Sequence, residues 1–340
     1  MKSLKVGLLG AGGISPVHVN GWKALGAQIS VYAVAGAPAL AEEHGLQPCE
    51  TPEELIHNAE IVCILTPSKY HRELALAAIE AGKHVVCEKP LGVTTEDSLA
   101  IAAAAAAANI QVYPAHVVRF FPDYARLKSE VESGRIGTPA ILRFSRSGAA
   151  PSPGSWFFSE PDGGGIILDQ MIHDLDQARW IAGDVVQVYA VQNPPTIEGQ
   201  VPEAVAAQVV LTHASGAISY IQGAWGPRTM PFLTSFEVAG STGVLRYDSR
   251  NDSTLVMDQG AAPEGASYLP PESQAESPYT TQIREFATAF SGGPPPRVSA
   301  ADGVLAVALA EAAQESVRSG TAVDFDSAAI LAPLMRSHAV

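Results

Sequence analysis

The chain has 340 residues, of which 47% are apolar and 16% are charged, and its formal net charge is −14. This length predicts two domains, and the composition supports large buried cores and argues against a disordered chain. The acidic balance repels phosphate backbones, so we expect no nucleic-acid partner. A nucleotide cofactor stays open, because such sites rely on backbone N–H groups more than on net charge.

The three cysteines show neither a CxxC spacing nor a cluster with histidine, so the sequence predicts neither a disulfide framework nor a metal site. No apolar stretch approaches the ~18 residues of a membrane span. The first residues also lack the cleavage pattern of a leader peptide. We therefore expect a cytoplasmic protein without a membrane partner.

The first third of the chain alternates short apolar runs with helical patterns. Strands are predicted at residues 4–9, 29–34, 60–65 and 84–87. Helices are predicted between them, from residue 14 to about 25, from residue 51, at 68–81 and at 94–108. Such alternation predicts a parallel sheet covered on both faces, a doubly wound α/β domain that we place at residues 1–118.

The rest of the chain has a different pattern. Helices are predicted at 122–133, 165–181, 281–291 and 300–319, and loops at 147–165 and 258–278. Alternating apolar runs at 205–211, 217–221 and 233–238 predict strands of an antiparallel sheet. Residues 119–340 are therefore predicted to form an α+β domain.

A glycine-rich segment, Gly10 to Gly13 followed by Ile14 and Ser15, lies between the first strand and its helix. Glycines there allow a tight turn and a close approach of backbone to a pyrophosphate on the helix N-terminus. An ordinary turn is the alternative, but the position in a βαβ unit favours nucleotide binding. The small residue that usually completes the motif is Ser15.

The second predicted strand ends without the carboxylate that holds the ribose hydroxyls in NAD-specific sites. Residues 34–38 carry neither an acid nor a base. The cofactor is therefore predicted to be NAD or NADP, with modest discrimination between them.

Two further patterns carry chemistry. Lys89 follows the strand at 84–87, at the end of the sheet where ligands bind, and its charge could polarise a substrate oxygen. Asp169 and His173 are four residues apart, hence on one face of a predicted helix, as in a proton shuttle with its orienting carboxylate. A solvated surface is the alternative for both patterns, and a metal site at the helix lacks a third ligand.

The ordered motifs of the chain resemble the glucose–fructose oxidoreductase and inositol dehydrogenase (Gfo/Idh/MocA) family. They are GLLGAGGIS at 7–15, TPSKYHRELALAAIEAGKHVVCEKPLG at 66–92, HVVRFFPDYARL at 116–127, SGRIGTP at 133–139 and GGGIILDQMIHDLDQARWIAG at 163–183. The resemblance implies an N-terminal Rossmann domain and a C-terminal α+β domain with a large, mostly antiparallel open sheet. It also implies an NAD(P)-dependent oxidoreductase acting on a sugar, inositol or related polyol, assembled as a homodimer or homotetramer through that sheet.

The same resemblance assigns residues to the cofactor. The glycine-rich segment, with Gly10, Gly12, Gly13 and Ile14, would hold the pyrophosphate. Thr66, Pro67 and His71 would line the nicotinamide end. Glu88 would contact the nicotinamide ribose, and Trp156 would lie near the cofactor, although Phe157 replaces the arginine that often follows it.

Substrate contacts follow from the same comparison. Lys89 would lie between cofactor and substrate, with a cis peptide to Pro90. His173 would be the general acid/base, and Asp169 and His116 would contact substrate.

Two alternatives to a dehydrogenase share this fold. Some relatives use bound NAD transiently to cleave glycosidic bonds, and a galactose-pathway transcriptional regulator binds a dinucleotide as a non-catalytic sensor. The presence of Lys89, Asp169 and His173 together favours catalysis over sensing.

Overall fold

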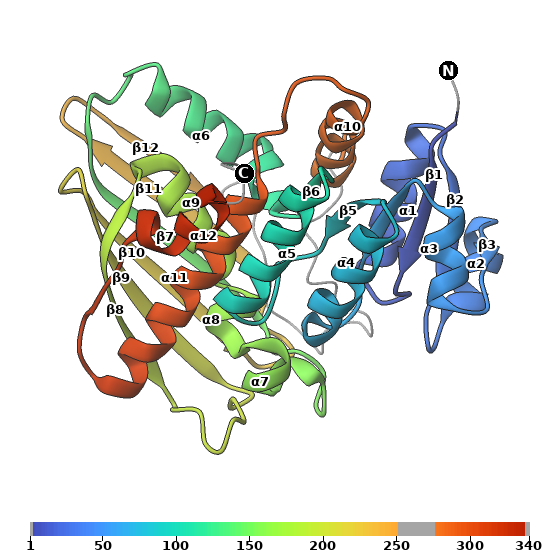
Figure 1. Cartoon of the computed structure of the whole chain (residues 1–340). Helices are drawn as coiled ribbons and strands as arrows, with labels where there is room; N and C mark the ends of the chain where they lie inside the picture. The colour runs from blue at the N-terminus through green and yellow to red at the C-terminus, as the bar shows by residue number, and fades with distance from the viewer. Residues whose placement is uncertain (1–2, 251–275, 337–340) are drawn as a thin grey trace. The chain divides into compact units, whose positions relative to one another are not determined.

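The computed structural model describes residues 3–250 and 276–336, which form two compact units (Figure 1). The first unit contains the described residues up to Phe121 together with 276–307 and 330–336. The second contains residues 122–250 and 308–329. The chain thus returns twice to the first unit, so the two units are not separated by the single boundary predicted between residues 118 and 119. The loop predicted at 258–278 falls almost entirely outside the described residues.

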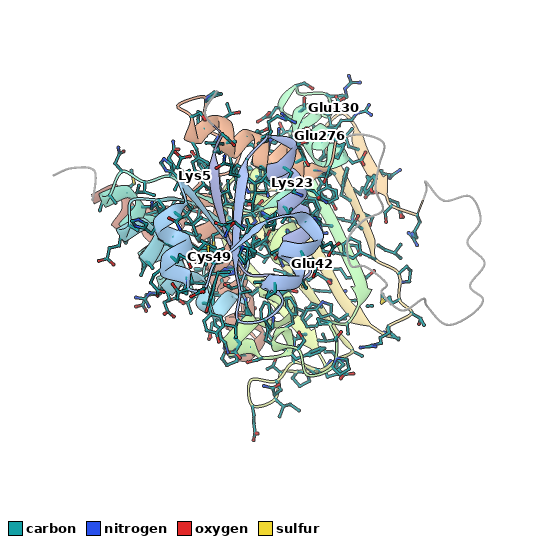
Figure 2. The ribbon with its side chains drawn as sticks, turned by 90° about the vertical axis from the view of Figure 1, so that its right-hand side faces the viewer. Lys5, Lys23, Glu42, Cys49, Glu130 and Glu276 are labelled. Carbon is teal, nitrogen blue, oxygen red and sulfur yellow. The ribbon has the colours of Figure 1, made fainter. Side chains whose placement is uncertain are left out.

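The first unit is built on a parallel sheet with the strand order β3-β2-β1-β4-β5-β6. Its strands are β1 (Lys5–Leu9), β2 (Gln28–Tyr32), β3 (Gln47–Pro48), β4 (Ile61–Ile64), β5 (His84–Cys87) and β6 (Val112–Pro114). Lys5 opens β1 and Cys49 follows β3, so the two residues mark the amino and carboxyl ends of the sheet (Figure 2). The order reverses between β1 and β4, and sheets of this kind bind dinucleotides at the carboxyl ends beside that reversal.

Helices cover both faces of this sheet. One core packs against α1 (Ser15–Ala24), α2 (Ala37–His44) and α10 (Pro278–Phe290). The other packs against α3 (Pro52–Asn58), α4 (His71–Glu80) and α5 (Thr95–Ala107). Successive side chains of a strand point to opposite faces of the sheet, so each strand contributes to both cores. In β1, Val6 and Leu8 enter the first core and Leu9 enters the second. The alanine run at 102–107 is an ordered helix, as its high helix propensity predicts.

Helix α10 reaches this unit from far along the chain. It packs on α1 at Gly21, where a Cβ would lie 2.5 Å from Cδ1 of Ile283. Glycine at that point allows the two helices to approach closely. Tertiary packing, which local patterns do not report, therefore assigns this helix to the nucleotide-binding fold.

The second unit contains a seven-stranded sheet with the order β12-β11-β7-β10-β9-β8-β13. Its strands are β7 (Pro139–Ala149), β8 (Val185–Asn193), β9 (Val205–His213), β10 (Ile218–Gly226), β11 (Leu233–Gly240), β12 (Val244–Asp248) and β13 (Val323–Asp324). All neighbours are antiparallel except β7 and β10. The mostly antiparallel open sheet is thus confirmed. The loop predicted from residue 147 is partly wrong, because β7 continues to Ala149.

Several helices complete the fold. They are α6 (Pro122–Glu132), α7 (Glu160–Gly163), α8 (Gly165–Asp169), α9 (Ile172–Ala182), α11 (Ala300–Ser319) and α12 (Ser327–Arg336), with 3-10 turns η1 (Ser68–Tyr70), η2 (Val117–Phe120) and η3 (Trp156–Phe158). In the second unit α8 and α9 pack on one face of the sheet, where Met171 fills the space above Gly223. Among the described residues, no helix is long and apolar enough to cross a membrane. The cytoplasmic location stays a prediction.

The helix predicted at 165–181 is in fact two helices. Gln170 and Met171 keep right-handed helical dihedral angles. The Met171 N–H, however, bonds to the carbonyl of Ile166, five residues back, which interrupts the i−4 ladder. Asp169 ends α8 and His173 lies in the first turn of α9, so the prediction of one uninterrupted helix face for this pair is wrong.

Candidate functional site

The glycine-rich loop closes the carboxyl end of β1. Gly10 has a φ of 122°, and a Cβ there would lie 2.5 Å from the carbonyl oxygen of Leu65, so only glycine fits. Its N–H donates to the carbonyl of Tyr32 at 2.8 Å. The buried Ser15 hydroxyl donates back to the Gly10 carbonyl at 3.1 Å. Ser15 thus closes the loop at the position where a third glycine or alanine is usual.

The surface of this loop fits a dinucleotide. Among the described residues, no atom lies within 4 Å of a Cβ built on Gly12, so backbone is open there. Ile14 precedes α1 and offers no side-chain cap to its first turn. The Ser15 N–H donates to the Gly12 carbonyl at 3.0 Å, and Pro16 has no N–H. Val17 and the preceding glycine-rich loop would therefore supply the N–H donors for an anion. The Thr66 hydroxyl, at the end of β4, is buried without a hydrogen-bond partner among the described residues. A bound ligand would supply one.

His71 holds together two loops of the site. Its Nδ1 lies 2.7 Å from the carbonyl oxygen of Pro90, and its Nε2 lies 3.0 Å from that of Thr66. Burial lowers the pKa of His71 and favours the neutral ring, which donates to only one of these oxygens. The ring therefore fixes the loop of Thr66 and Pro67 against the turn that follows Lys89, and its contribution to the site is the position of those loops.

Both carboxylate oxygens of Glu88, at the same edge of the sheet, accept hydrogen bonds. Glu88 follows β5, its side chain is 12% exposed, and its Oε1 lies 2.8 Å from Nε2 of His18 on α1. Its Oε2 accepts from the backbone N–H of Lys89 at 3.2 Å. Burial alone would raise the pKa of Glu88, but His18 and Lys89 lower it overall, so the carboxylate is ionised at neutral pH. The Lys89–Pro90 peptide is cis, as predicted.

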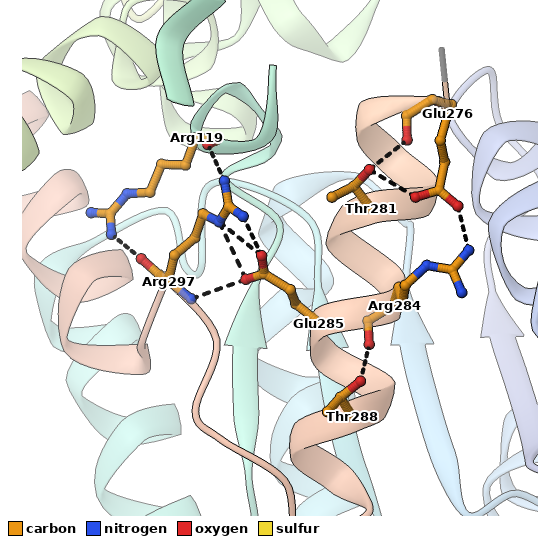
Figure 3. Close-up of polar contacts among 8 residues, drawn as sticks. Arg119, Glu276, Thr281, Arg284, Glu285, Thr288 and Arg297 are labelled. Atoms are coloured by element: carbon orange, nitrogen blue, oxygen red, sulfur yellow. Dashed lines mark hydrogen bonds and ion pairs between the residues drawn. The ribbon is translucent and has the colours of Figure 1, made fainter. Parts of the chain in front are cut away.

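His116 lies at the end of β6 and is buried. The turn η2 that it begins is anchored by Arg119, which donates to the carbonyl of Arg297 at 2.6 Å while Arg297 donates to the carbonyl of Arg119 at 3.1 Å (Figure 3). Arg297 in turn pairs with Glu285 of α10. The returning segment of the chain thus fixes the backbone next to His116.

In the second unit, Asp169 and His173 flank the break between α8 and α9. Two anchors hold that break on the sheet. The side-chain amide of Gln170 donates to the carbonyl of Arg146 on β7 at 3.0 Å. Arg146 also forms a two-point ion pair with Asp174, at 2.8 and 2.9 Å, and these side chains are 6% and 0% exposed.

Trp156 belongs to the same unit and is half-buried. It stacks on Phe157, with ring centroids 3.9 Å apart, and it covers Gly163, where a Cβ would meet its ring at 2.9 Å. Among the residues that the structure describes, there is no group of three histidine, cysteine or acidic side chains that could hold a metal ion.

Two protein-family models match the chain, one in each unit. Residues 4–116 match an oxidoreductase family with an NAD-binding Rossmann fold, and residues 124–246 match the GFO/IDH/MocA C-terminal domain. The chain belongs to the Gfo/Idh/MocA family. It is therefore an NAD(P)-dependent oxidoreductase, and its first unit is the NAD-binding domain.

Relatives of this Gfo/Idh/MocA chain span almost its whole length. It is 29% identical over 336 residues to a myo-inositol 2-dehydrogenase of Thermotoga maritima, covering 95% of this chain and 99% of the relative. It is 32% identical over 340 residues to a 1,5-anhydro-D-fructose reductase of Ensifer adhaerens, covering 94% and 98%. The structure of a levoglucosan dehydrogenase in complex with NADH is 25% identical with a TM-score of 0.81, covering 96% and 100%.

The fold brings the predicted residues of the first unit to one edge. Gly10 follows β1, Thr66 follows β4, Glu88 follows β5 and His116 follows β6. Asp169, His173 and Trp156 lie in the second unit.

Sequence reasoning missed His18, Arg146 and Asp174 in this Gfo/Idh/MocA chain. The signal for Arg146 was available, because Leu142 and Phe144 precede it at alternate positions and predict that its side chain is buried. A buried arginine requires an acidic partner. The signal for His18 was weaker, since nothing near it in the sequence indicates Glu88.

Proposed function

We propose that this enzyme oxidises a secondary hydroxyl of a sugar, inositol or related polyol, or reduces the matching ketone, with Lys89, Asp169 and His173 as reacting residues. The observation that supports this most strongly is the arrangement at the end of β5, where an ionised Glu88 precedes Lys89 beside the open glycine-rich loop. The names of the relatives, which are dehydrogenases and reductases of inositol and sugars, point to the same substrate class.

The chemistry divides between cofactor and side chains. Bound nicotinamide supplies a hydride acceptor at its C4 position. His173 takes the proton of the substrate hydroxyl, and Asp169 binds the substrate hydroxyls and orients them. Lys89 stabilises the negative charge that develops on the reacting oxygen, and His116 contributes a substrate contact.

Cofactor binding is assigned to the loop and the strand ends. Gly10, Gly12, Gly13 and Ile14 take the pyrophosphate, Thr66, Pro67 and His71 form the nicotinamide end, Glu88 and Lys89 take the adjoining ribose, and Trp156 contributes from the second unit. The loop after β2 offers no charge that would select NAD or NADP. We therefore infer that both cofactors bind.

A pair of glycine variants separates cofactor binding from folding. Gly12→Ala is expected to weaken NADH binding roughly tenfold or more, because the added methyl occupies the surface that approaches the pyrophosphate, without lowering the melting temperature. Gly10→Ala is expected to lower the melting temperature, since its Cβ meets the Leu65 backbone. NADH fluorescence titration and thermal unfolding without cofactor measure the two effects. Unchanged NADH affinity in Gly12→Ala would contradict the assignment of the loop.

The test of function is a panel of inositols, sugars and polyols, each with NAD and with NADP, monitored by absorbance of the reduced cofactor. We expect turnover with at least one polyol or sugar and a ketone product. Release of free sugar from a glycoside without net cofactor reduction would replace the proposal with the glycosidase. Tight NADH binding without turnover on any member would replace it with the sensor.

The open face of the second sheet supports assembly with a second copy of the chain. The strand register aligns a continuous row of side chains across it, Arg246, Glu237, Arg143, Tyr220, Val210 and Tyr189. The row begins with ion pairs of Glu237 to both arginines and ends with exposed apolar groups, of which Tyr220 is 44% and Tyr189 is 42% exposed. A shallow hollow lined by residues of this row has a volume of about 540 Å³. We infer a homodimer or homotetramer through this face.

Placing a charge in the apolar part of this row tests the assembly. Tyr189→Glu is expected to shift the protein from oligomer to monomer, because its neighbour in the row is Val210 and a buried carboxylate there would lack a partner in the interface. Sedimentation velocity at micromolar concentration measures this shift. Lys5→Met, at the amino end of β1 in the first unit, is the control and should leave the oligomer unchanged. An unaltered protein that sediments as a monomer would refute the interface.

A further inference from the structure

A buried histidine outside the assigned residues lies against the cofactor edge of the first unit. His18 lies one turn into α1, the helix that begins after the glycine-rich loop, and it is 0% exposed. Its Nε2 is 2.8 Å from Oε1 of Glu88, which is 70 positions later in the sequence. The contact joins the helix that follows the pyrophosphate loop to the loop that carries Lys89.

The donor and acceptor in this contact are fixed by chemistry. An ionised carboxylate only accepts hydrogen bonds, so Nε2 of His18 carries the hydrogen. Its Nδ1 is buried and has no hydrogen-bond partner among the described residues, which leaves Glu88 as the polar contact of the ring. The second carboxylate oxygen of Glu88 accepts from the Lys89 backbone N–H at 3.2 Å. Glu88 is thus held at both oxygens, with lone pairs left for a ligand.

We propose that His18 is a positioning residue of the cofactor site, holding the Glu88 carboxylate in the orientation that accepts the hydroxyl hydrogens of a cofactor ribose. The proposal rests on the proposed role of Glu88 in cofactor binding. His18 acts only through Glu88 and the adjoining loop. Its removal therefore affects the affinity for the cofactor before it affects any step of hydride transfer.

The other titratable groups near Glu88 do not hold its carboxylate in place as His18 does. The titratable side chains that interact with Glu88 are His18, Lys89, His71, Cys63 and Cys87. Burial raises the pKa of Cys63 to about 12 and that of Cys87 well above its usual value, so both thiols are neutral. Burial lowers the pKa of His71, and both nitrogens of its ring face backbone carbonyl oxygens, not Glu88. Among the side chains that the structure describes, His18 and Lys89 are therefore the ones that oppose the effect of burial on the pKa of Glu88.

This leads to a pH dependence of cofactor affinity. The ribose hydroxyls donate to the ionised carboxylate, and the pKa of Glu88 is depressed, so affinity is complete at neutral pH and is lost as the pH falls through that pKa. Without His18, only the interactions with Lys89 would counter the effect of burial among the described residues, so the pKa of Glu88 would rise. The loss of affinity then begins at a higher pH.

The test measures NADH dissociation constants between pH 4 and 8 for the unaltered protein, His18→Leu, His18→Gln and Glu88→Gln, with melting temperatures of the cofactor-free proteins. We expect His18→Leu to bind NADH on the order of tenfold more weakly at neutral pH and to lose affinity at a higher pH than the unaltered protein. His18→Gln keeps an N–H donor near the position of Nε2 but loses the charge interaction of the ring with Glu88. It should bind within about threefold of the unaltered protein at neutral pH and lose affinity at a pH between those of the unaltered protein and His18→Leu.

The outcomes separate this inference from the proposed function. Normal NADH binding by Glu88→Gln would overturn the assignment of Glu88 to the cofactor. Weakened binding by Glu88→Gln together with an unchanged constant and pH profile in His18→Leu would overturn the role of His18 alone. Should His18→Leu fail to fold, the double variant His18→Leu/Glu88→Gln removes the unpaired carboxylate. It must then bind NADH as tightly as Glu88→Gln does, and His18→Gln must bind NADH within about threefold of the unaltered protein at neutral pH.

Discussion

Replacing Lys89 by methionine is expected to lower kcat roughly 10²- to 10³-fold, and replacing His173 by asparagine roughly 10²- to 10⁴-fold. Methionine keeps most of the lysine stem and removes the charge that stabilises the reacting oxygen. Asparagine keeps a polar group that cannot exchange protons at neutral pH. Both variants should lower kcat much more than they weaken NADH binding, and the weakening should be larger for Lys89→Met, which also loses a contact to the cofactor ribose.

Two further features distinguish this expectation from simple damage. The combined loss in Lys89→Met/His173→Asn should be smaller than the product of the single losses, because groups that act on one oxygen are not additive. The pH–rate profile of the unaltered enzyme should contain an ionisation that disappears in His173→Asn. Steady-state kinetics on the substrate found in the panel measure both, with the exposed His57→Asn as a control. Near-normal turnover in both single variants would remove these residues from the reaction.

The second large effect concerns the ion pair beneath His173. Arg146→Met leaves the Asp174 carboxylate fully buried without its partner, so the free energy of unfolding of the second unit should fall by about 3–5 kcal/mol. Because Asp174 follows His173 directly, kcat should fall as well. Urea denaturation followed by tryptophan fluorescence measures the stability.

A compensating change checks the cause. Arg146→Met/Asp174→Leu removes both charges and should recover most of the lost stability, since a buried pair replaced by apolar groups is often neutral. The control Arg126→Met removes an arginine that is 79% exposed and pairs with Glu130 four residues on, and it should change stability little. Equal destabilisation by Arg126→Met and Arg146→Met would contradict the importance of burial.

The nucleotide-binding fold could be predicted because its signals are local. The strands β1, β2, β4 and β5 are short apolar runs, and the helices α1, α4 and α5 follow β1, β4 and β5 closely. The short strands β3 and β6 and the helix α2 were not predicted. The glycine at position 10 indicates the conformation of the loop, because the positive φ and the nearby Leu65 backbone exclude any side chain there. Strand ends at one edge of a parallel sheet then place distant residues at the same edge, here Thr66 after β4 and Glu88 after β5.

The missed features depend on contacts between distant segments. β7 carries Arg143 and Arg146 among its apolar residues, and the ion pair with the buried Asp174 explains the burial of Arg146. The break between α8 and α9 is held by Gln170 bonding to a strand, while its dihedral angles stay helical. His18 and Glu88 likewise meet only through the packing of α1 on the sheet.

Isotope transfer tests the central claim most directly. The substrate with the highest turnover in the panel is prepared with deuterium on the carbinol carbon and incubated with NAD, and the reduced cofactor is analysed by mass spectrometry. Direct hydride transfer predicts one deuterium in each NADH formed and one ketone for each NADH. Reduced cofactor without deuterium, or consumption of substrate with no net NADH and no ketone, would contradict the assignment of this protein as a polyol or sugar dehydrogenase.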